Sequence, residues 1–276
     1  MALNVPTFFK RLGSSIVFVA IMLTGLLWNE WSFLALICLI EVLCLRDYFR
    51  LVQKIDKDAY WPPWVPVLIQ LLALAILFLF SNMMSGFLPG ITTGIMVLLP
   101  VLPALILLAA VLSKKNALMA LLQSAGGILY ITLPMLLLLC MRPYGFVLPL
   151  AVILMIWCND TMAYLVGSFI GKHRFSSISP NKTWEGVIGG ASLTIIGAGI
   201  YGYLSHTFRF VDWMVLALCV TVAGTLGDLM ESKLKRMADI KDSGNLMPGH
   251  GGALDRFDSL LIAAPFAFVY SYYFMR

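Results

Sequence analysis

The sequence predicts an all-α fold, a polytopic transmembrane helical bundle of about nine spans with its N-terminus in the cytoplasm. Hydrophobic residues make up 61% of the 276 residues and charged residues only 12%, whereas a soluble domain carries about 25% charged residues. Several apolar runs are long enough to cross a hydrocarbon core of about 30 Å. We therefore expect a single integral membrane domain over residues 1–276.

Apolar runs locate the expected helices in chain order. They cover 12–28, 31–45, 64–81, 92–112, 117–140, 146–169, 186–205, 210–230 and 259–275. Only Asn29 and Glu30 separate the first two short runs, so one bent or re-entrant segment is an alternative there. Lys10 and Arg11 precede the first run, as in a signal peptide, but no small-residue cleavage site follows. We therefore expect this run to remain a spanning helix.

The distribution of basic residues favours nine spans over eight. With a cytoplasmic N-terminus, all nineteen Lys and Arg residues except Arg142, Arg209 and Arg276 fall on the cytoplasmic side. Cytoplasmic loops of membrane proteins carry such an excess, and merging the first two runs would destroy the pattern. The net charge of +5 then requires no nucleic-acid partner. The five cysteines lie in or beside apolar runs without C-x-x-C spacing, which indicates neither disulfides nor zinc.

We expect the functional site in two polar cytoplasmic loops, at roughly 170–186 and 228–258. Asp255 and Asp258 are three residues apart where the last helix begins, so their carboxylates share one face near the positive end of the helix dipole. Asp228 ends the eighth run and could complete a Mg²⁺ site with substrate phosphates. The alternative is that these carboxylates only pair with nearby Lys and Arg at the membrane surface.

The second loop also contains glycines around His250. Backbone N–H groups in such a stretch can form an anion-binding concavity, and neighbouring cations can bind phosphate. These cations are Lys235, Arg236, Lys241 and Arg256. The mixture of carboxylates, glycines and cations is what nucleotidyl transfer requires.

Asn159 and Asp160 lie inside the sixth apolar run, ahead of the first polar loop. A carboxylate at that depth is costly, which makes Asp160 a functional-site candidate. A structural ion pair with a neighbouring helix, or a misplaced span end, is the alternative. In the loop itself, Ser179 before Pro180 predicts a helix start whose free N–H groups would face an anion. The plainer alternative is a capped start of the seventh span.

The pattern S-x-x-K-R-x-x-x-x-K-D-x-x-x-x-x-P-G-H-G-G-x-x-D-R-x-D, from Ser232 to Asp258, resembles the signature of phosphatidate cytidylyltransferases, or CDP-diacylglycerol synthases. The stretch from Trp157 to Gly190 resembles the upstream motif of the same family. The likeness covers roughly the C-terminal 120 residues. It thus marks 146–276 as the catalytic part and leaves the helices of 1–145 without an assigned role.

The resemblance implies Mg²⁺-dependent transfer of a cytidylyl group from CTP to phosphatidic acid at the cytoplasmic face of a bacterial inner membrane. It implies Mg²⁺, alone or with a second cation, held by Asp228, Asp255 and Asp258, and it is compatible with a homodimer. The residues it assigns to the triphosphate or lipid phosphate are Lys235, Arg236, Lys241, His250 and Arg256. Those assigned to the rest of the substrate site are Asn159, Asp160, Lys172, Ser179, Lys182, Thr183, Glu185, Asp242, Gly251 and Gly252.

Two other functions remain to be distinguished. A CTP-dependent lipid kinase, such as a polyprenol kinase, would transfer the terminal phosphate and release CDP instead of pyrophosphate. A cation-coupled transporter could use Asp160 and broken helices, but it predicts charged residues along a path through the bilayer. The charges of this sequence gather on one side instead, and a purely structural scaffold would need no polar loop of this kind.

Overall fold

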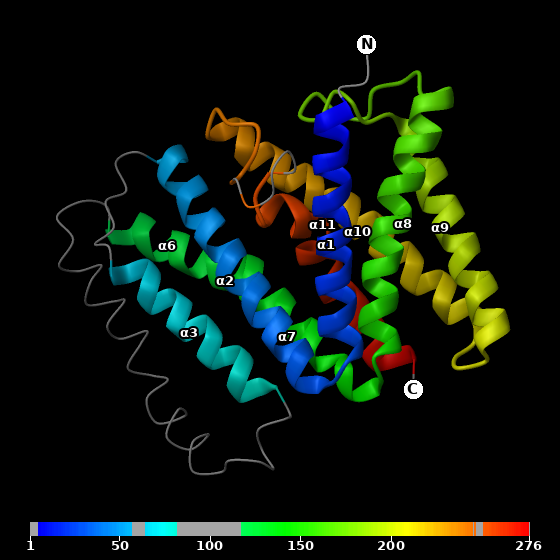
Figure 1. Cartoon of the computed structure of the whole chain (residues 1–276), viewed down its shortest axis with the longest axis horizontal. Coiled ribbons are helices and arrows are strands. Elements are labelled where there is room, and N and C mark those ends of the chain that lie inside the picture. Colours follow the sequence, from blue (N-terminus) through cyan, green and yellow to red (C-terminus); the bar gives the residue numbers. More distant parts are fainter. Residues whose placement is uncertain (1–4, 57–63, 82–116, 245, 247–250, 276) are drawn as a thin grey trace. The chain divides into compact units, whose positions relative to one another are not determined.

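The computed structural model describes residues 5–56, 64–81, 117–244, 246 and 251–275, all drawn as ribbon in Figure 1. Within these ranges every regular element is a helix, and the one strand-like feature is an isolated bridge between Arg174 and Thr183. The predicted all-α class is therefore confirmed. The predicted run 92–112 and the candidate residue His250 lie outside the described residues.

The chain divides into two compact units. Unit 1 comprises residues 1–140 and 237–257, and unit 2 comprises residues 141–236 and 258–276. Five helical stretches in the described ranges are long and apolar enough to span a membrane, so the chain is an integral membrane protein. They are Leu121–Cys140, Val147–Ile170, Trp184–Ser205, Phe210–Met237 and Leu254–Phe274.

Unit 1 begins with α1 (Val5–Leu27) and α2 (Glu30–Ile55), which are separate helices. Asn29 separates them because it caps α2: its Oδ1 accepts the Ser32 N–H at 2.7 Å, and its own N–H donates to Ser32 Oγ at 3.0 Å. The helix continues ten residues beyond the apolar run that ends at 45. Buried side chains such as Tyr48 and Leu51 hold the extension against unit 1, which hydropathy alone does not detect.

The rest of unit 1 packs around α2. Figure 1 shows α2, α3 (Trp64–Phe80), α6 (Ala117–Gly127) and α7 (Leu133–Cys140) lying side by side. A π-helical turn, η1 (Ile128–Thr132), joins α6 to α7 just before Pro134. Since proline has no N–H and its ring clashes with the preceding turn, the wider turn accommodates it without breaking the helix.

Unit 2 contains the short 3-10 turn η2 (Arg142–Tyr144), followed by α8 (Val147–Ile170), α9 (Trp184–Ser205), α10 (Phe210–Met237) and most of α11 (Leu254–Phe274). The helices α8 and α9 run along each other, as Figure 1 shows. Glycine permits this close approach: a Cβ at Gly190 would lie 2.8 Å from the Ala163 Cβ.

The predicted loop 228–258 is shorter in the structure. Helix α10 continues to Met237 and α11 begins at Leu254, so only residues 238–253 connect them. The added turns of α10 are rich in helix-forming residues and include the ion pair between Glu231 and Lys235 at i,i+4. The candidates Asp228, Lys235 and Arg236 therefore lie on a helix, where their directions are fixed.

Candidate functional site

Three carboxylates of unit 2 form a cluster. Asp228 and Glu231 lie three residues apart on α10, and Asp258 lies on α11; one oxygen of each is within 4.8 Å of the others. The helices approach closely here because residue 227 is a glycine, where a Cβ would lie 2.5 Å from the Asp258 carbonyl oxygen. Glu231 is fully buried, while the Asp228 side chain is 27% exposed. Carboxylate oxygens in this arrangement could bind a hard divalent cation.

Two lysines neutralise part of this charge. Lys182 forms an ion pair with Asp228, and Lys235 forms one with Glu231. Ser232 Oγ also donates to Asp228 Oδ1 at 3.3 Å. The alternative that these carboxylates pair with nearby lysines is thus true of Asp228 and Glu231. It still leaves three carboxylates facing two ammonium groups within this cluster, and a cation would balance the remaining charge.

Lys182 lies in a short hairpin between α8 and α9. The Phe175 N–H donates to the Lys182 carbonyl oxygen at 2.8 Å, and the Trp184 N–H donates to the His173 carbonyl oxygen at 2.9 Å. The hairpin fixes the backbone on both sides of the lysine. A flexible loop would not hold the ammonium group beside one particular carboxylate.

The helix start predicted at Ser179 is wrong. Ser179 and Pro180 begin a turn in which the Lys182 N–H donates to the Ser179 carbonyl oxygen at 3.1 Å. Helix α9 starts at Trp184, and Thr183 is its N-cap, with Oγ1 accepting the Gly186 N–H at 3.2 Å. The backbone of residues 182–184 is used in the hairpin, so the helix cannot begin earlier. Thr183 therefore has a structural role in addition to any contact with substrate.

Glu185 closes the other end of the hairpin. Its Oε2 accepts the backbone N–H of Lys172 at 3.1 Å and of His173 at 3.2 Å, and its Oε1 lies 2.5 Å from His173 Nδ1. The carboxylate is thus occupied by the polypeptide itself. The side chain of Lys172 is exposed.

Asn159 and Asp160, both on α8, have different surroundings. Asn159 is 5% exposed and its Oδ1 makes no hydrogen bond within the described structure. Asp160 is exposed and interacts electrostatically with Asp258. A buried acceptor without a donor is costly in a helix that crosses a membrane, which is consistent with a bound polar group at this point.

Asp255 forms hydrogen bonds with a different set of residues, which belong to unit 1. Its Oδ2 accepts the Ser243 N–H at 2.8 Å, the Ser243 hydroxyl at 2.9 Å and the Gly252 N–H at 2.7 Å. The Gly252 N–H, expected to face an anion, is therefore satisfied by this carboxylate. Gly251 has a φ of +80°, in the left-handed region that favours glycine.

Sequence reasoning did not identify Asp47, which holds the same loop from α2. Its side chain is 1% exposed, and its Oδ2 accepts the N–H of Ala253 at 2.7 Å. The Leu254 N–H points to the same oxygen at 3.5 Å. A Cβ at Gly252 would lie 2.5 Å from that oxygen, so the glycine is needed for the carboxylate to approach.

Asp47 lies beyond the predicted membrane run 31–45. Burial raises the pKa of its carboxyl above the usual value, although the hydrogen bonds and the nearby charges of Arg46 and Arg50 act in the opposite direction. The only signal for Asp47 in the sequence is an acidic residue between Arg46 and Arg50, just beyond the apolar run. Glu231, also missed, could have been found because it lies three residues after Asp228 and thus shares its helix face.

The remaining candidates are exposed. They are Arg236 on α10, Lys241 and Asp242 in the connecting segment, and Arg256 on α11. The structure therefore groups Lys182, Asp228, Lys235 and Asp258 in unit 2, and Gly251, Gly252 and Asp255 in unit 1.

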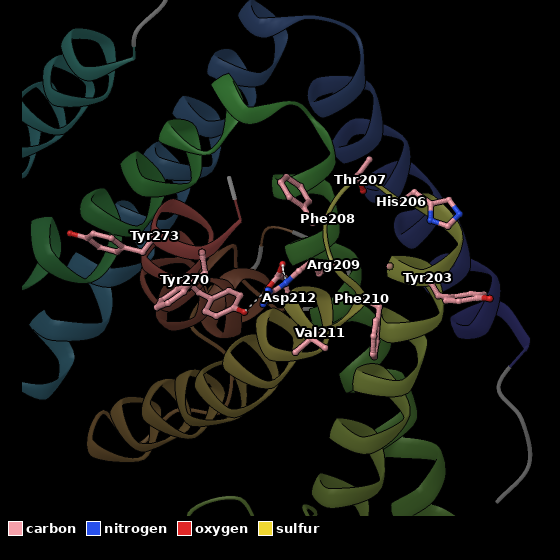
Figure 2. A pocket seen from close by; sticks show the side chains of 12 residues that line it. Tyr203, His206, Thr207, Phe208, Arg209, Phe210, Val211, Asp212, Tyr270 and Tyr273 are labelled. Atoms are coloured by element: carbon pink, nitrogen blue, oxygen red, sulfur yellow. Dashed lines mark hydrogen bonds and ion pairs between the residues drawn. The ribbon is translucent and has the colours of Figure 1, made fainter.

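Unit 2 also has a cavity of about 840 Å³ at the start of α10, shown in Figure 2. Arg209 and the hydroxyl of Tyr270 both bond the buried carboxylate of Asp212 there. Asp228 lies sixteen residues further along the same helix, a distance of about 24 Å at 1.5 Å per residue. The cavity is therefore separate from the acidic cluster.

Comparison with known proteins covers nearly the whole chain. The model of a family described as the cytidylyltransferase family matches residues 9–274. A phosphatidate cytidylyltransferase of Bacillus subtilis is 43% identical over 127 residues, which cover 45% of this chain and 47% of that protein. One of Haemophilus influenzae is 41% identical over 140 residues, which cover 48% of each. One of Synechocystis is 30% identical over 293 residues, covering 95% of each.

The chain spans about half the length of the first two of these relatives and nearly all of the third. The family resemblance inferred from the motif between Ser232 and Asp258 is thereby confirmed.

Proposed function

Because this chain belongs to the cytidylyltransferase family, we propose that it transfers a cytidylyl group from CTP to phosphatidic acid, giving CDP-diacylglycerol and pyrophosphate for phospholipid biosynthesis. The observation that carries the proposal is the carboxylate cluster of Asp228, Glu231 and Asp258 with its two lysines. These charges lie where α10 and α11 leave their apolar stretches. A site at a helix end can meet both a lipid and a water-soluble nucleotide.

The reaction requires positioning more than acid–base chemistry. An ionised phosphate oxygen of phosphatidic acid attacks the α-phosphorus of CTP, a new P–O bond forms, and the bond to the β-phosphate breaks to release pyrophosphate. No general base is needed because the nucleophile carries no proton near neutral pH. We assign Lys182 and Lys235, which lie at the carboxylate cluster, to stabilising the negative charge of the phosphates.

We assign Mg²⁺ to Asp228, Glu231 and Asp258, the three carboxylates that lie together in unit 2. Bound there, Mg²⁺ would draw charge from the phosphoryl oxygens and fix their geometry. Glu231 extends the ligand set inferred from sequence. A second cation remains part of the proposal, because three carboxylates can supply oxygen ligands to more than one ion.

We further propose nine spans with a cytoplasmic N-terminus, a site facing the cytoplasm, a location in the bacterial inner membrane, and a homodimer. The distribution of Lys and Arg supports the orientation. It also brings the site to the compartment in which CTP is found. The phospholipid substrate then diffuses to the site within the bilayer.

The test uses purified protein in lipid nanodiscs that contain phosphatidic acid, with CTP labelled on either its α- or its γ-phosphate. We expect label in the lipid from α-labelled CTP only, with release of pyrophosphate. Lipid label from γ-labelled CTP, with release of CDP, would identify a lipid kinase. Absence of labelled lipid with both forms would leave the transporter class and reject the proposal.

Asp258→Asn is the matching variant, because it removes one carboxylate charge from the cluster with little change in shape. We expect it to abolish turnover while leaving membrane insertion intact. Asp239→Asn is its control, since Asp239 is exposed and has a φ of 53°, which asparagine tolerates. Turnover near the wild-type rate in Asp258→Asn would contradict the assignment.

A further inference from the structure

The cytoplasmic end of α2 forms one wall of a cavity in unit 1. The cavity has a volume of about 560 Å³ and is lined on one side by Arg46, Arg50 and Lys54. Its opposite side is formed by Asp242, Ser243 and Gly244 of the segment that connects α10 to α11. Binding sites for small molecules commonly occupy about 300–1,000 Å³. The space is therefore adequate for a phosphate-bearing group.

The side chains of Arg46, Arg50 and Lys54 all line this one cavity. They are four residues apart in sequence, so they follow one face of α2, and all three side chains are exposed. Asp242, which is exposed, is the one acidic residue among those that line the cavity. Two further carboxylates adjoin the lining: Asp47, 3.8 Å from Arg46, and Asp255, which accepts from Ser243. The lining itself thus carries three cations and one carboxylate. An alternative is that these basic residues do no more than orient the chain in the membrane. Orientation alone, however, would not require a cavity beside them.

The wall facing these cations is held in place by hydrogen bonds. Ser243 is 6% exposed, and both its N–H and its hydroxyl donate to Asp255 Oδ2. Asp47 accepts the Ala253 N–H from the other end of the same segment. The Asp47 carboxylate also lies against Gly244, where a Cβ would be 2.8 Å from Oδ1. The α2 cations therefore face a fixed surface that belongs to the family motif.

We propose that this α2 pocket, whose lining includes Arg46, Arg50, Lys54, Asp242, Ser243 and Gly244, binds a phosphate-bearing anion. The inference deepens the proposed function and rests on it, because both substrates of that reaction carry phosphate. Arginine can bind two phosphate oxygens at once, and lysine adds a mobile point charge. The phosphate can come from the triphosphate of the nucleotide or from the headgroup of an anionic lipid. Ser243 links a group bound here to Asp255.

The test measures binding rather than turnover, so it does not depend on the success of the proposed reaction. In one arm, calorimetry measures the affinity of CTP and of inorganic pyrophosphate for the protein in nanodiscs of neutral lipid. In the other arm, the protein is titrated with short-chain phosphatidic acid in detergent. The variants are Arg50→Gln and Lys54→Gln. Lys233→Gln is the control, because it removes one exposed cation from α10, outside the pocket.

We expect each pocket variant to weaken binding of one ligand class by about tenfold, the loss typical of one charged hydrogen bond. Weaker binding of CTP and pyrophosphate identifies the nucleotide as the source, and weaker binding of phosphatidic acid identifies the lipid. Arg50→Lys should recover part of the affinity. A change below about twofold in both arms, or an equal loss in Lys233→Gln, would overturn the proposal. Because the variants alter exposed side chains, an unchanged thermal unfolding midpoint verifies their folding.

Discussion

Replacement of Asp47 tests whether its carboxylate holds the loop as a hydrogen-bond acceptor or as a charge. In Asp47→Ala, the Ala253 N–H loses its acceptor, at 2.7 Å in the wild type. Leaving one buried N–H unsatisfied costs about 1–3 kcal/mol. The Leu254 N–H adds little because its distance of 3.5 Å is long for a hydrogen bond. We therefore expect Asp47→Ala to lower the free energy of unfolding by about 2 kcal/mol.

Asp47→Asn should cost much less, because the amide oxygen keeps the acceptor in place. The charge itself is unfavourable, since burial raises the pKa of Asp47. Removal of the charge offsets the loss of its attraction to the N-terminus of α11, which is worth about 0.3–1 kcal/mol. We expect Asp47→Asn to remain within about 1 kcal/mol of the wild type.

The pH dependence follows from the same shift. A carboxyl whose pKa is raised on folding ionises more easily in the unfolded chain, so it destabilises the fold once the pH exceeds its ordinary value of 3.8. As the pH falls through the raised value toward 3.8, the wild type should gain stability relative to Asp47→Asn. The opposite slope would show that the charge is favourable.

The assays are reversible unfolding in mixed micelles and hydrogen exchange at the Ala253 amide. Exchange at that amide should accelerate in Asp47→Ala and remain slow in Asp47→Asn. Equal destabilisation of both variants would refute the reasoning, because it would assign the effect to charge. Wild-type stability and slow exchange in Asp47→Ala would show that the contact does not hold the loop.

Further predictions concern three other residues. Gly252→Ala places a methyl group 2.5 Å from the Asp47 carboxylate and should destabilise the fold by about 1–3 kcal/mol, whereas Gly197→Ala meets no atom within 4 Å and should be neutral or stabilising in unfolding assays. Glu231→Gln should weaken Mn²⁺ binding, measured by electron paramagnetic resonance, by about tenfold or more; unchanged affinity would remove this residue from the metal site. Thr183→Ala removes the cap of α9 and should cost about 1 kcal/mol, seen as a lower unfolding midpoint that Thr183→Ser largely restores.

Hydropathy predicted the positions of the long helices well, because a membrane span requires about twenty apolar residues whatever surrounds it. The run expected at 146–169 is helix Val147–Ile170 in the structure. Helix ends outside the membrane were less predictable. Both α2 and α10 continue into polar sequence, where packing and ion pairs decide the end.

The candidate site was predictable where its residues lie in one motif and not where they meet through folding. Asp258 was named from the motif and Asp228 from its place at the end of the preceding apolar run, and the structure brings both together with Glu231. Asp47 was missed because its partner Ala253 is 206 residues away in sequence. No local pattern records such a pairing. The helix start predicted at Ser179 was wrong for a local reason. The hairpin uses backbone groups that an earlier helix would need.

The separation of Asp47 from Ala253 has a consequence for biosynthesis. A ribosome that adds about 5–20 residues per second needs roughly 10–40 s to produce the 206 residues between them. During that interval the Asp47 carboxylate of α2 cannot accept the Ala253 N–H, while later helices enter the bilayer. A chain that stalls before residue 253 would therefore leave the Asp47 carboxylate without the N–H group that it accepts in the folded protein.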